Sequence, residues 1–389
     1  MTAFKNYLGY RLKSSFVSTL SFALIALLIT ITTASEGVSS FEYDQPGRTG
    51  IESLATIMGI IASIIPMLET DIFKNRRNLD TLYFLPLSRF KMALAHYISG
   101  LIQMFAIYTV AFLGHFLVLC KYAKYFKLQY MPLYYILLLL LGVAIYSIFI
   151  FLYGEANSTA DGVICSVMWI FALYLFALVV IIPIREYAFN FVYKPNGVDV
   201  SPEYFDFTRE MNVFALWFLP YTSINNLTVI FQDVMEGTRS WVGAGDCYDI
   251  AWVYEYPTLG EAIAERYSGN WYMIFFPIIA GAASVFGYFR TFAGKGAEKA
   301  GEVSSSWFCY KTLIPAYGFM GLVFTGFSGI MFFLIVAAMY LAYAIYRKSF
   351  KIRKADVFSM AGAAAAAFAF LLANSIIFSD LLGDLIIFS

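Results

Sequence analysis

Long apolar runs recur along this chain and constrain its fold more than any other feature. A bilayer core of about 30 Å is crossed by roughly 20 apolar residues in a helix. The 389 residues are 60% hydrophobic and only 13% charged, with a mean hydropathy of +0.71, which excludes a water-soluble globular domain. The sequence therefore predicts an all-α polytopic membrane protein. Six runs are predicted as membrane spans: 16–34, 51–68, 93–119, 132–153, 162–183 and 271–288.

The C-terminal region, 312–378, adds further spans to this six-span core. Residues 312–346 would reach roughly 50 Å as one helix at 1.5 Å per residue, so we expect two helices there. The glycines Gly321, Gly326 and Gly329 are typical of a tight outer turn between them. A last uncharged run brings the C-terminal spans to about three, and residues 379–389 then form an outer tail.

The placement of Lys and Arg predicts the orientation, because cytoplasmic loops retain positive charge. A cytoplasmic N-terminus puts most of the 26 basic residues inside, including those at 1–15, 290–311 and 347–354. The long segment 184–270 then lies outside and is acidic overall. Its apolar stretch 213–231 contains a proline and several polar residues, so we expect a re-entrant or surface-lying helix pair there.

Four common enzyme and nucleotide-binding motifs are absent from the sequence. It contains no G-x-x-x-x-G-K-S/T loop, no HExxH, no CxxC and no GxSxG. His96 and His115 lie near opposite ends of the third span, which favours interfacial or bundle-facing histidines over a metal site. Charged residues are nearly missing from the spans, which disfavours an ion-coupled carrier. We therefore expect no catalytic, cofactor-binding or metal-binding residues.

The loop 71–91 is a short and highly charged element between two spans. It holds five basic residues, and Ile72, Leu79 and Tyr83 recur at helical spacing. This pattern predicts an amphipathic helix of about three turns, which Pro86 ends. Ser88 is then placed to cap the helix of the third span. On periodicity alone, the alternative is a helix that lies on anionic lipid.

Several stretches together resemble the permease subunit of a type-2 ABC transporter, most closely Gram-positive permeases of antibiotic-responsive and acetoin-type operons. They are the N-terminal FKNYLGYRLKSS, the loop F-K-x-x-R-x-x-D-x-L-x-x-L-P-L-S-R over 73–89, and the basic FRTFAGKGAEKAGEVSSSW. The specific motif covers 73–89 and, more loosely, 290–307, whereas the topology covers most of the chain. The chain departs from a six-span permease in the long segment 184–270 and the C-terminal spans.

The resemblance implies a domain plan and a docking site. Residues 1–15 form an elbow helix, 16–183 the first five spans, 271–289 the sixth span and 290–311 a basic cytoplasmic loop. A coupling helix at 70–86 docks into a separate ATPase. The residues implied at that interface are Phe73, Arg76, Arg77, Asp80, Leu82, Pro86 and Arg89. A second, smaller inner contact is expected at Gly154, Glu155 and Asp161. For Glu155 and Asp161, a loop or helix-capping role is favoured over that of a mid-membrane acid in an ion-coupled carrier.

The resemblance further implies a non-catalytic transport subunit of the bacterial plasma membrane. ATP and Mg²⁺ would bind in the partner ATPase dimer, and a second permease copy or a paralogue would complete the pore. We expect lipids but no nucleic acid as further partners. The exported substrate is expected to be amphipathic: a peptide antibiotic, a lipid or a cell-wall-related compound. A sensor or scaffold that signals through the ATPase without net transport is the alternative, and a stand-alone membrane enzyme is disfavoured.

Overall fold

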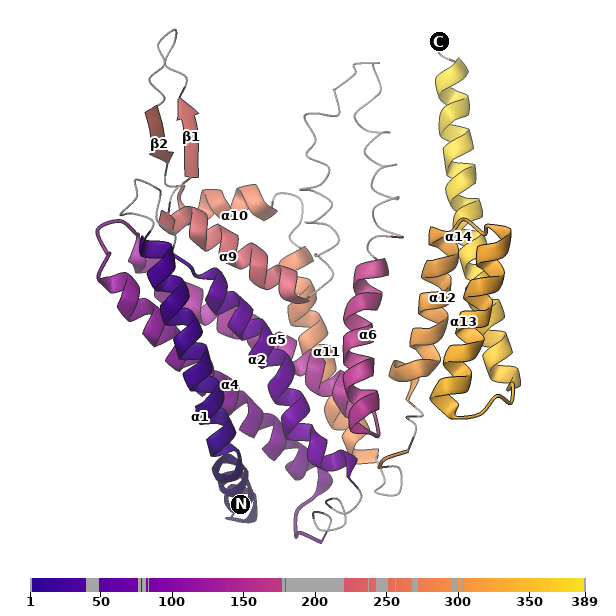
Figure 1. The fold of residues 1–389 in the computed structure, drawn as a ribbon, viewed down its shortest axis with the longest axis horizontal. Coiled ribbons are helices and arrows are strands. Elements are labelled where there is room, and N and C mark those ends of the chain that lie inside the picture. Colours follow the sequence, from indigo (N-terminus) through magenta and orange to yellow (C-terminus); the bar gives the residue numbers. More distant parts are fainter. Residues whose placement is uncertain are drawn as a thin grey trace. The chain divides into compact units, whose positions relative to one another are not determined.

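The computed structural model is almost entirely helical in the part of the chain that it describes (Figure 1). The described residues are 2–39, 49–75, 78, 82, 84–176, 179, 220–236, 238–242, 251–255, 257–267, 272–294, 300–302, 304 and 306–387. The helices are α1 (Thr2–Ser39), α2 (Glu52–Thr70), α4 (Arg89–Cys120), α5 (Met131–Glu155), α6 (Thr159–Phe176), α9 (Pro220–Glu236), α10 (Leu259–Tyr267), α11 (Tyr272–Gly294), α12 (Thr312–Phe324), α13 (Gly329–Arg347) and α14 (Lys354–Ile387).

Several short elements lie between these helices. Strands β1 (Thr238–Val242) and β2 (Ala251–Glu255) pair antiparallel, with Ser240 opposite Val253. Short helical turns cover Asp71–Lys74, Leu128–Tyr130 and Trp307–Lys311. They extend the ends of α2, α5 and α12.

The chain is a multi-pass α-helical membrane protein. Within the described residues, seven helices are long and apolar enough to cross a membrane. They are Ala3–Val38, Glu52–Lys74, Arg89–Cys120, Leu128–Glu155, Phe275–Phe292, Gly329–Arg347 and Lys354–Ala373. Two predicted spans are shorter here: α6 has an apolar stretch of Thr159–Ala172, and α12 has 13 residues. The end of the predicted span 162–183 lies largely outside the described residues.

Helix α1 differs from the expected elbow and span. It is one continuous helix of 38 residues, whereas the sequence predicts an elbow helix over 1–15 that is separate from a span beginning at 16. The serines at this junction do not interrupt the helix, because their hydroxyls donate to carbonyls about one turn earlier. Ser14 and Ser15, for example, both donate to the Arg11 carbonyl, at 2.9 and 3.0 Å.

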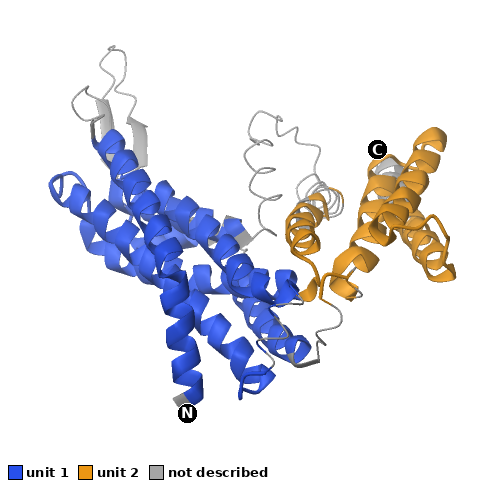
Figure 2. Cartoon of the chain, turned by 60° about the horizontal axis from the view of Figure 1, so that its bottom comes forward, with its two compact units in different colours: residues 1–154, 220–298 blue, residues 155–219, 299–389 orange. Residues whose placement is uncertain are grey.

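Contacts divide the chain into two compact units (Figure 2). Unit 1 comprises residues 1–154 and 220–298, and unit 2 comprises 155–219 and 299–389. In unit 1, α4 packs along α1 and α2, while α9 packs on α2 and α10. Helix α11 approaches α5 closely at Gly281, where an added Cβ would lie 2.8 Å from the Ala144 Cα. Because that obstacle is backbone, only glycine fits at this crossing.

Unit 2 contains the predicted C-terminal helical hairpin. Helices α12 and α13 are joined by a tight turn in which Gly326 and Phe327 have φ of 58° and 57°, so the glycine-marked turn is confirmed. Helix α12 packs on α14, α13 and α6. An ion pair between Arg347 Nη2 and Asp356 Oδ2, at 2.5 Å, joins the end of α13 to the first turn of α14. The apolar core between α6 and α12 includes Cys165 and Leu313.

The segment 184–270 is described only in part. Its predicted helix pair over 213–231 corresponds to a single described helix, α9, which Pro220 begins rather than breaks. The preceding part of that prediction lies outside the described residues.

Candidate functional site

A buried carboxylate, Glu69 of α2, gathers polar side chains from two other helices of unit 1. Its side chain is 2% exposed and lies one residue before the end of α2. Its Oε2 lies 3.0 Å from Arg11 Nη2 of α1 and 3.1 Å from His96 Nδ1 of α4. Its Oε1 accepts hydrogen bonds from the Ser99 hydroxyl, at 3.3 Å, and from the Gln103 amide of α4. One carboxylate therefore joins α1, α2 and α4.

Helical periodicity places these partners together. His96, Ser99 and Gln103 are separated by three and four residues, so they share one face of α4. Tyr7 and Arg11 are likewise one turn apart on α1. The Tyr7 hydroxyl lies 2.8 Å from His96 Nε2. If this hydroxyl donates, His96 accepts at Nε2 and donates from Nδ1 to Glu69, which orders the ring between two helices.

The chemistry of this cluster suits a structural role, holding α1, α2 and α4 together, better than it suits proton transfer. We call this structural cluster the Glu69 clamp. A carboxylate has about four acceptor positions, and Glu69 uses them on Arg11, His96, Ser99 and Gln103. No position is left for a substrate or an ion. The charge is balanced by Arg11, whose side chain is only 12% exposed. Loss of one member of such a buried pair is strongly destabilising, because the other charge remains uncompensated.

The loop after α2 begins against this cluster. The Phe73 ring packs edge-on to the His96 imidazole, with centroids 4.5 Å apart, and to the Phe292 ring of α11 at 4.7 Å. His96 thus contacts both Glu69 and Phe73. The first turn of the loop and the Glu69 cluster form one continuous packed structure across α2, α4 and α11.

A second set of contacts fixes this turn to the end of α5. Lys74 Nζ donates to the Tyr153 carbonyl at 2.6 Å and lies 4.1 Å from the centre of the Tyr153 ring. The Tyr153 hydroxyl donates in turn to Asp71 Oδ1 at 3.0 Å. A lysine at a helix C-terminus satisfies a carbonyl that has no partner within the helix. Asp71, Tyr153 and Lys74 therefore tie the loop to α5.

The remainder of the loop presents both buried and exposed side chains. Leu82 is 9% exposed and packs with Tyr7, Met92 and Ala95 on α1 and α4. Phe84, by contrast, is 89% exposed. The Ser88 hydroxyl accepts from the Lys91 backbone N–H at 3.4 Å at the start of α4, so its predicted capping role is confirmed.

Of the seven residues predicted for the loop interface, two are packed inside the protein, two are exposed and three are not described. Phe73 and Leu82 face the protein's own helices, so their apolar side chains are occupied within this chain. Pro86 and Arg89 are exposed. The other three, Arg76, Arg77 and Asp80, lie outside the described residues, and the contact of the set with a partner stays a prediction.

The smaller predicted contact lies at the junction after α5. Glu155 is 5% exposed, its carboxylate accepts from the Ser306 hydroxyl, and its carbonyl accepts from Ser304 Oγ at 3.0 Å. Asp161 is half-buried in the first turn of α6, where its N–H donates to Ser158 Oγ at 3.2 Å. Gly154 packs on Tyr288. The buried Glu155 carboxylate is therefore used inside unit 2.

Sequence reasoning missed the Glu69 cluster. The pattern that could have predicted it is the spacing of His96, Ser99 and Gln103, which lie on one face of a helix inside an apolar span. Polar side chains on one face of a membrane helix need partners. His96 and His115 are both fully buried, and His115 Nε2 lies 2.9 Å from the Thr49 carbonyl. The prediction of bundle-facing histidines is confirmed.

Within the described part of the chain, no three His, Cys, Asp or Glu side chains gather closely enough to hold a metal ion. Comparison of the chain with family models, with curated proteins and with solved structures finds no match in any of the three.

Proposed function

We propose that this chain is the non-catalytic membrane subunit of an ATP-driven ABC transporter, and that the loop between α2 and α4 receives the movement of a separate ATPase. One observation supports this most directly. The loop is fixed at its start to three helices, yet it exposes the apolar Phe84 and Leu85 beside the exposed Arg89. Exposed apolar groups with a charged rim are typical of a docking surface.

The contacts of the loop supply a route for displacement. Displacement of the loop by the ATPase would move Phe73, which packs on His96 of α4 and Phe292 of α11. It also acts on α5 through Lys74 and the Tyr153 carbonyl. Since His96 bonds to Glu69 and Tyr7, α1 and α2 move with it. Rigid helices joined by packed side chains can carry such a displacement across a bundle.

The remaining parts of the proposal follow the sequence resemblance. ATP and Mg²⁺ bind to the partner ATPase dimer, and a second permease copy or paralogue completes the assembly. The N-terminus and the loop between α2 and α4 face the cytoplasm of a bacterial cell, in agreement with their basic charge. The exported substrate is amphipathic, such as a peptide antibiotic, a lipid or a cell-wall-related compound.

The test compares exposed loop residues with a matched basic residue elsewhere. The tagged chain is purified from its own host in mild detergent, and the complex is assayed for a co-purifying ATPase and for ATP turnover. We expect Phe84→Ser with Arg89→Glu to lower the yield of the ATPase, because apolar and attractive charge contacts are lost. Lys351→Glu, an exposed charge reversal in unit 2, should leave the yield unchanged.

Three outcomes would reject the proposal. The first is ATP hydrolysis by the chain after rigorous removal of any ATPase. The second is the absence of an ATPase from the wild-type preparation. The third is an unchanged yield of the complex and an unchanged rate of ATP turnover in the Phe84→Ser, Arg89→Glu variant. That result would indicate that the exposed part of the loop binds anionic lipid rather than an ATPase. If a substrate stimulates ATP turnover but is not transported, the chain would instead be a sensor or scaffold that signals through the ATPase.

A further inference from the structure

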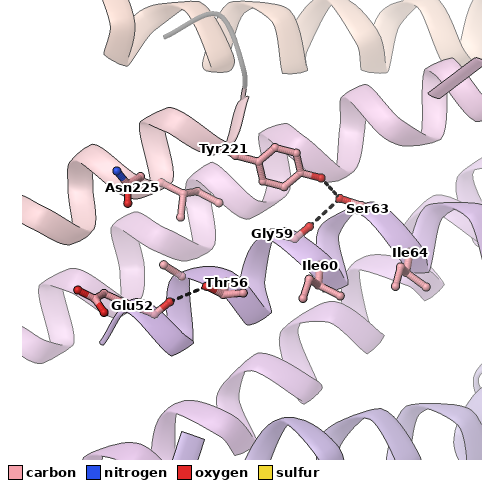
Figure 3. A pocket seen from close by; sticks show the side chains of 10 residues that line it. Glu52, Thr56, Gly59, Ile60, Ser63, Ile64, Tyr221 and Asn225 are labelled. Carbon is pink, nitrogen blue, oxygen red and sulfur yellow. Dashed lines mark hydrogen bonds between the residues drawn. The ribbon is translucent and has the colours of Figure 1, made fainter. Parts of the chain in front are cut away.

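A groove of about 450 Å³ runs between α2 and α9 in unit 1. Figure 3 shows Glu52 and Asn225 at one end of it, and Ser63 with Tyr221 at the other. Its size is that of pockets that hold small molecules. The groove is separate from the Glu69 cluster, since no residue of that cluster lines it.

One end of the groove is acidic. The Glu52 side chain is exposed, and its Oε1 accepts a hydrogen bond from Gln232 Nε2 at 2.7 Å. Glu52 is a member of none of the ion pairs Arg11–Glu69, His96–Glu69 and Arg347–Asp356. The amide of Asn225, also exposed, adds hydrogen-bonding capacity beside it. This end favours a positively charged group.

The rest of the groove is largely apolar. Ile60 and Ile64 line it and are 51% and 37% exposed on a helix of membrane-spanning length. The polar atoms nearby are already paired, because the Tyr221 hydroxyl bonds to Ser63 Oγ, which donates to the Gly59 carbonyl at 2.6 Å. Gly59 also makes room for the Tyr221 ring, which would lie 2.9 Å from an added Cβ.

We propose that this groove binds one single-chain amphiphile with a cationic head group. The head lies at Glu52 and Asn225, and the aliphatic chain follows α2 past Ile60 and Ile64. The 12 residue steps from Glu52 to Ile64 span roughly 18 Å of helix, which is the length of one extended aliphatic chain. An anionic head is excluded by repulsion from Glu52. The inference does not rest on the proposed function, because unit 1 alone builds the groove and binding needs no ATPase.

The experiment uses the full chain in nanodiscs of zwitterionic lipid. The probe is dodecyltrimethylammonium with a photoreactive diazirine on its chain, and cross-linked peptides are located by mass spectrometry. We expect labelling within 52–64 or 221–225, with displacement by unlabelled dodecyltrimethylammonium and not by dodecyl sulfate. Glu52→Gln should weaken binding of the ammonium probe about three- to fivefold, as expected for a partly exposed charge pair.

Matched variants separate binding from folding. Glu36→Gln removes an exposed carboxylate of α1 that does not line the groove, and should leave labelling unchanged. Thr56→Phe places a ring in the groove at an exposed position of α2, and should abolish labelling at an unchanged melting temperature. Equal displacement by dodecyl sulfate would overturn the proposal. Labelling confined to other regions, or labelling that survives both Glu52→Gln and Thr56→Phe, would also overturn it.

Discussion

The Phe73 ring meets the His96 imidazole edge-on, with centroids 4.5 Å apart and planes inclined at 68°. The same imidazole lies 3.1 Å from Glu69 through Nδ1. An exposed loop and a buried ionic cluster therefore share one side chain. Spatial contact alone does not measure energetic coupling, so the relationship leads to two predictions on stability.

The first concerns the carboxylate. Glu69→Gln should lower the free energy of unfolding by about 3 kcal/mol, because Arg11 loses its buried counter-charge. Arg11→Met combined with Glu69→Gln should recover part of this loss, since no unpaired charge remains. SDS-induced unfolding in mild detergent measures both values. Glu36→Gln, at an exposed position, is the control, and a Glu69→Gln protein as stable as wild type would contradict the clamp.

The second prediction is a double-mutant cycle between Phe73→Ala and Glu69→Gln. Residues that share a contact have interaction energies of about 0.5 to 3 kcal/mol, and we expect a value in this range because both residues touch His96. The cycle of Phe84→Ala with Glu69→Gln is the control, since Phe84 is 89% exposed. Its effects should add within about 0.5 kcal/mol. Additive effects in both cycles would show that the loop and the cluster are independent.

Features of the fold and of the candidate site that depend on residues close in the sequence could be predicted, whereas those that depend on residues far apart in the sequence could not. The apolar spans and the Ser88 cap follow from residues close in the sequence, so periodicity and composition are sufficient. The turn at Gly326 is found for the same reason. The continuity of α1 was missed, because hydroxyls that bond within a helix give no break signal.

The features that depend on distant residues were not predicted. Glu69 and Arg11 are 58 positions apart, and Ser63 and Tyr221 are 158 apart. Their meeting depends on how α1, α2, α4 and α9 pack, which no local pattern specifies. The exposed Phe84 and the buried Leu82 show the same limit, since an apolar ridge does not reveal whether its own helices or a partner covers it.

A third prediction tests the proposed orientation. In a background without the native cysteines, Ala264→Cys on α10 and Lys351→Cys between α13 and α14 both place a thiol at an exposed position. The cytoplasmic side retains basic loops, so Cys at 351 should react with an impermeant maleimide only after permeabilisation. In the predicted topology five spans, 162–183 included, precede α10, so Cys at 264 should react in intact cells. The reverse pattern, or equal labelling of both, would invert or reject the orientation while leaving the membrane assignment intact.

The fourth prediction concerns pH and the start of α10. The Thr258 hydroxyl accepts from the Glu261 backbone N–H at 3.3 Å, and Glu261 Oε2 accepts from the Thr258 N–H at 2.8 Å, which is a reciprocal capping box. Hydrogen bonds to the Glu261 carboxylate, first from the Thr258 backbone N–H and second from the Thr258 side chain, lower the pKa of Glu261 below its ordinary value of 4.5. A carboxyl with a depressed pKa stabilises the folded state above its unfolded pKa.

The stabilisation by Glu261 should therefore be present in full at neutral pH and disappear as the pH falls through the lowered pKa. Hydrogen exchange of the α10 amides measures it, as the ratio of protection between wild type and Glu261→Gln, in which the intrinsic exchange rate cancels. The glutamine keeps an oxygen acceptor and removes the charge. We expect a ratio above one at pH 7 that declines towards one below pH 4.5. A ratio that stays constant on acidification, or that rises, would show that the charge of Glu261 does not hold the helix start.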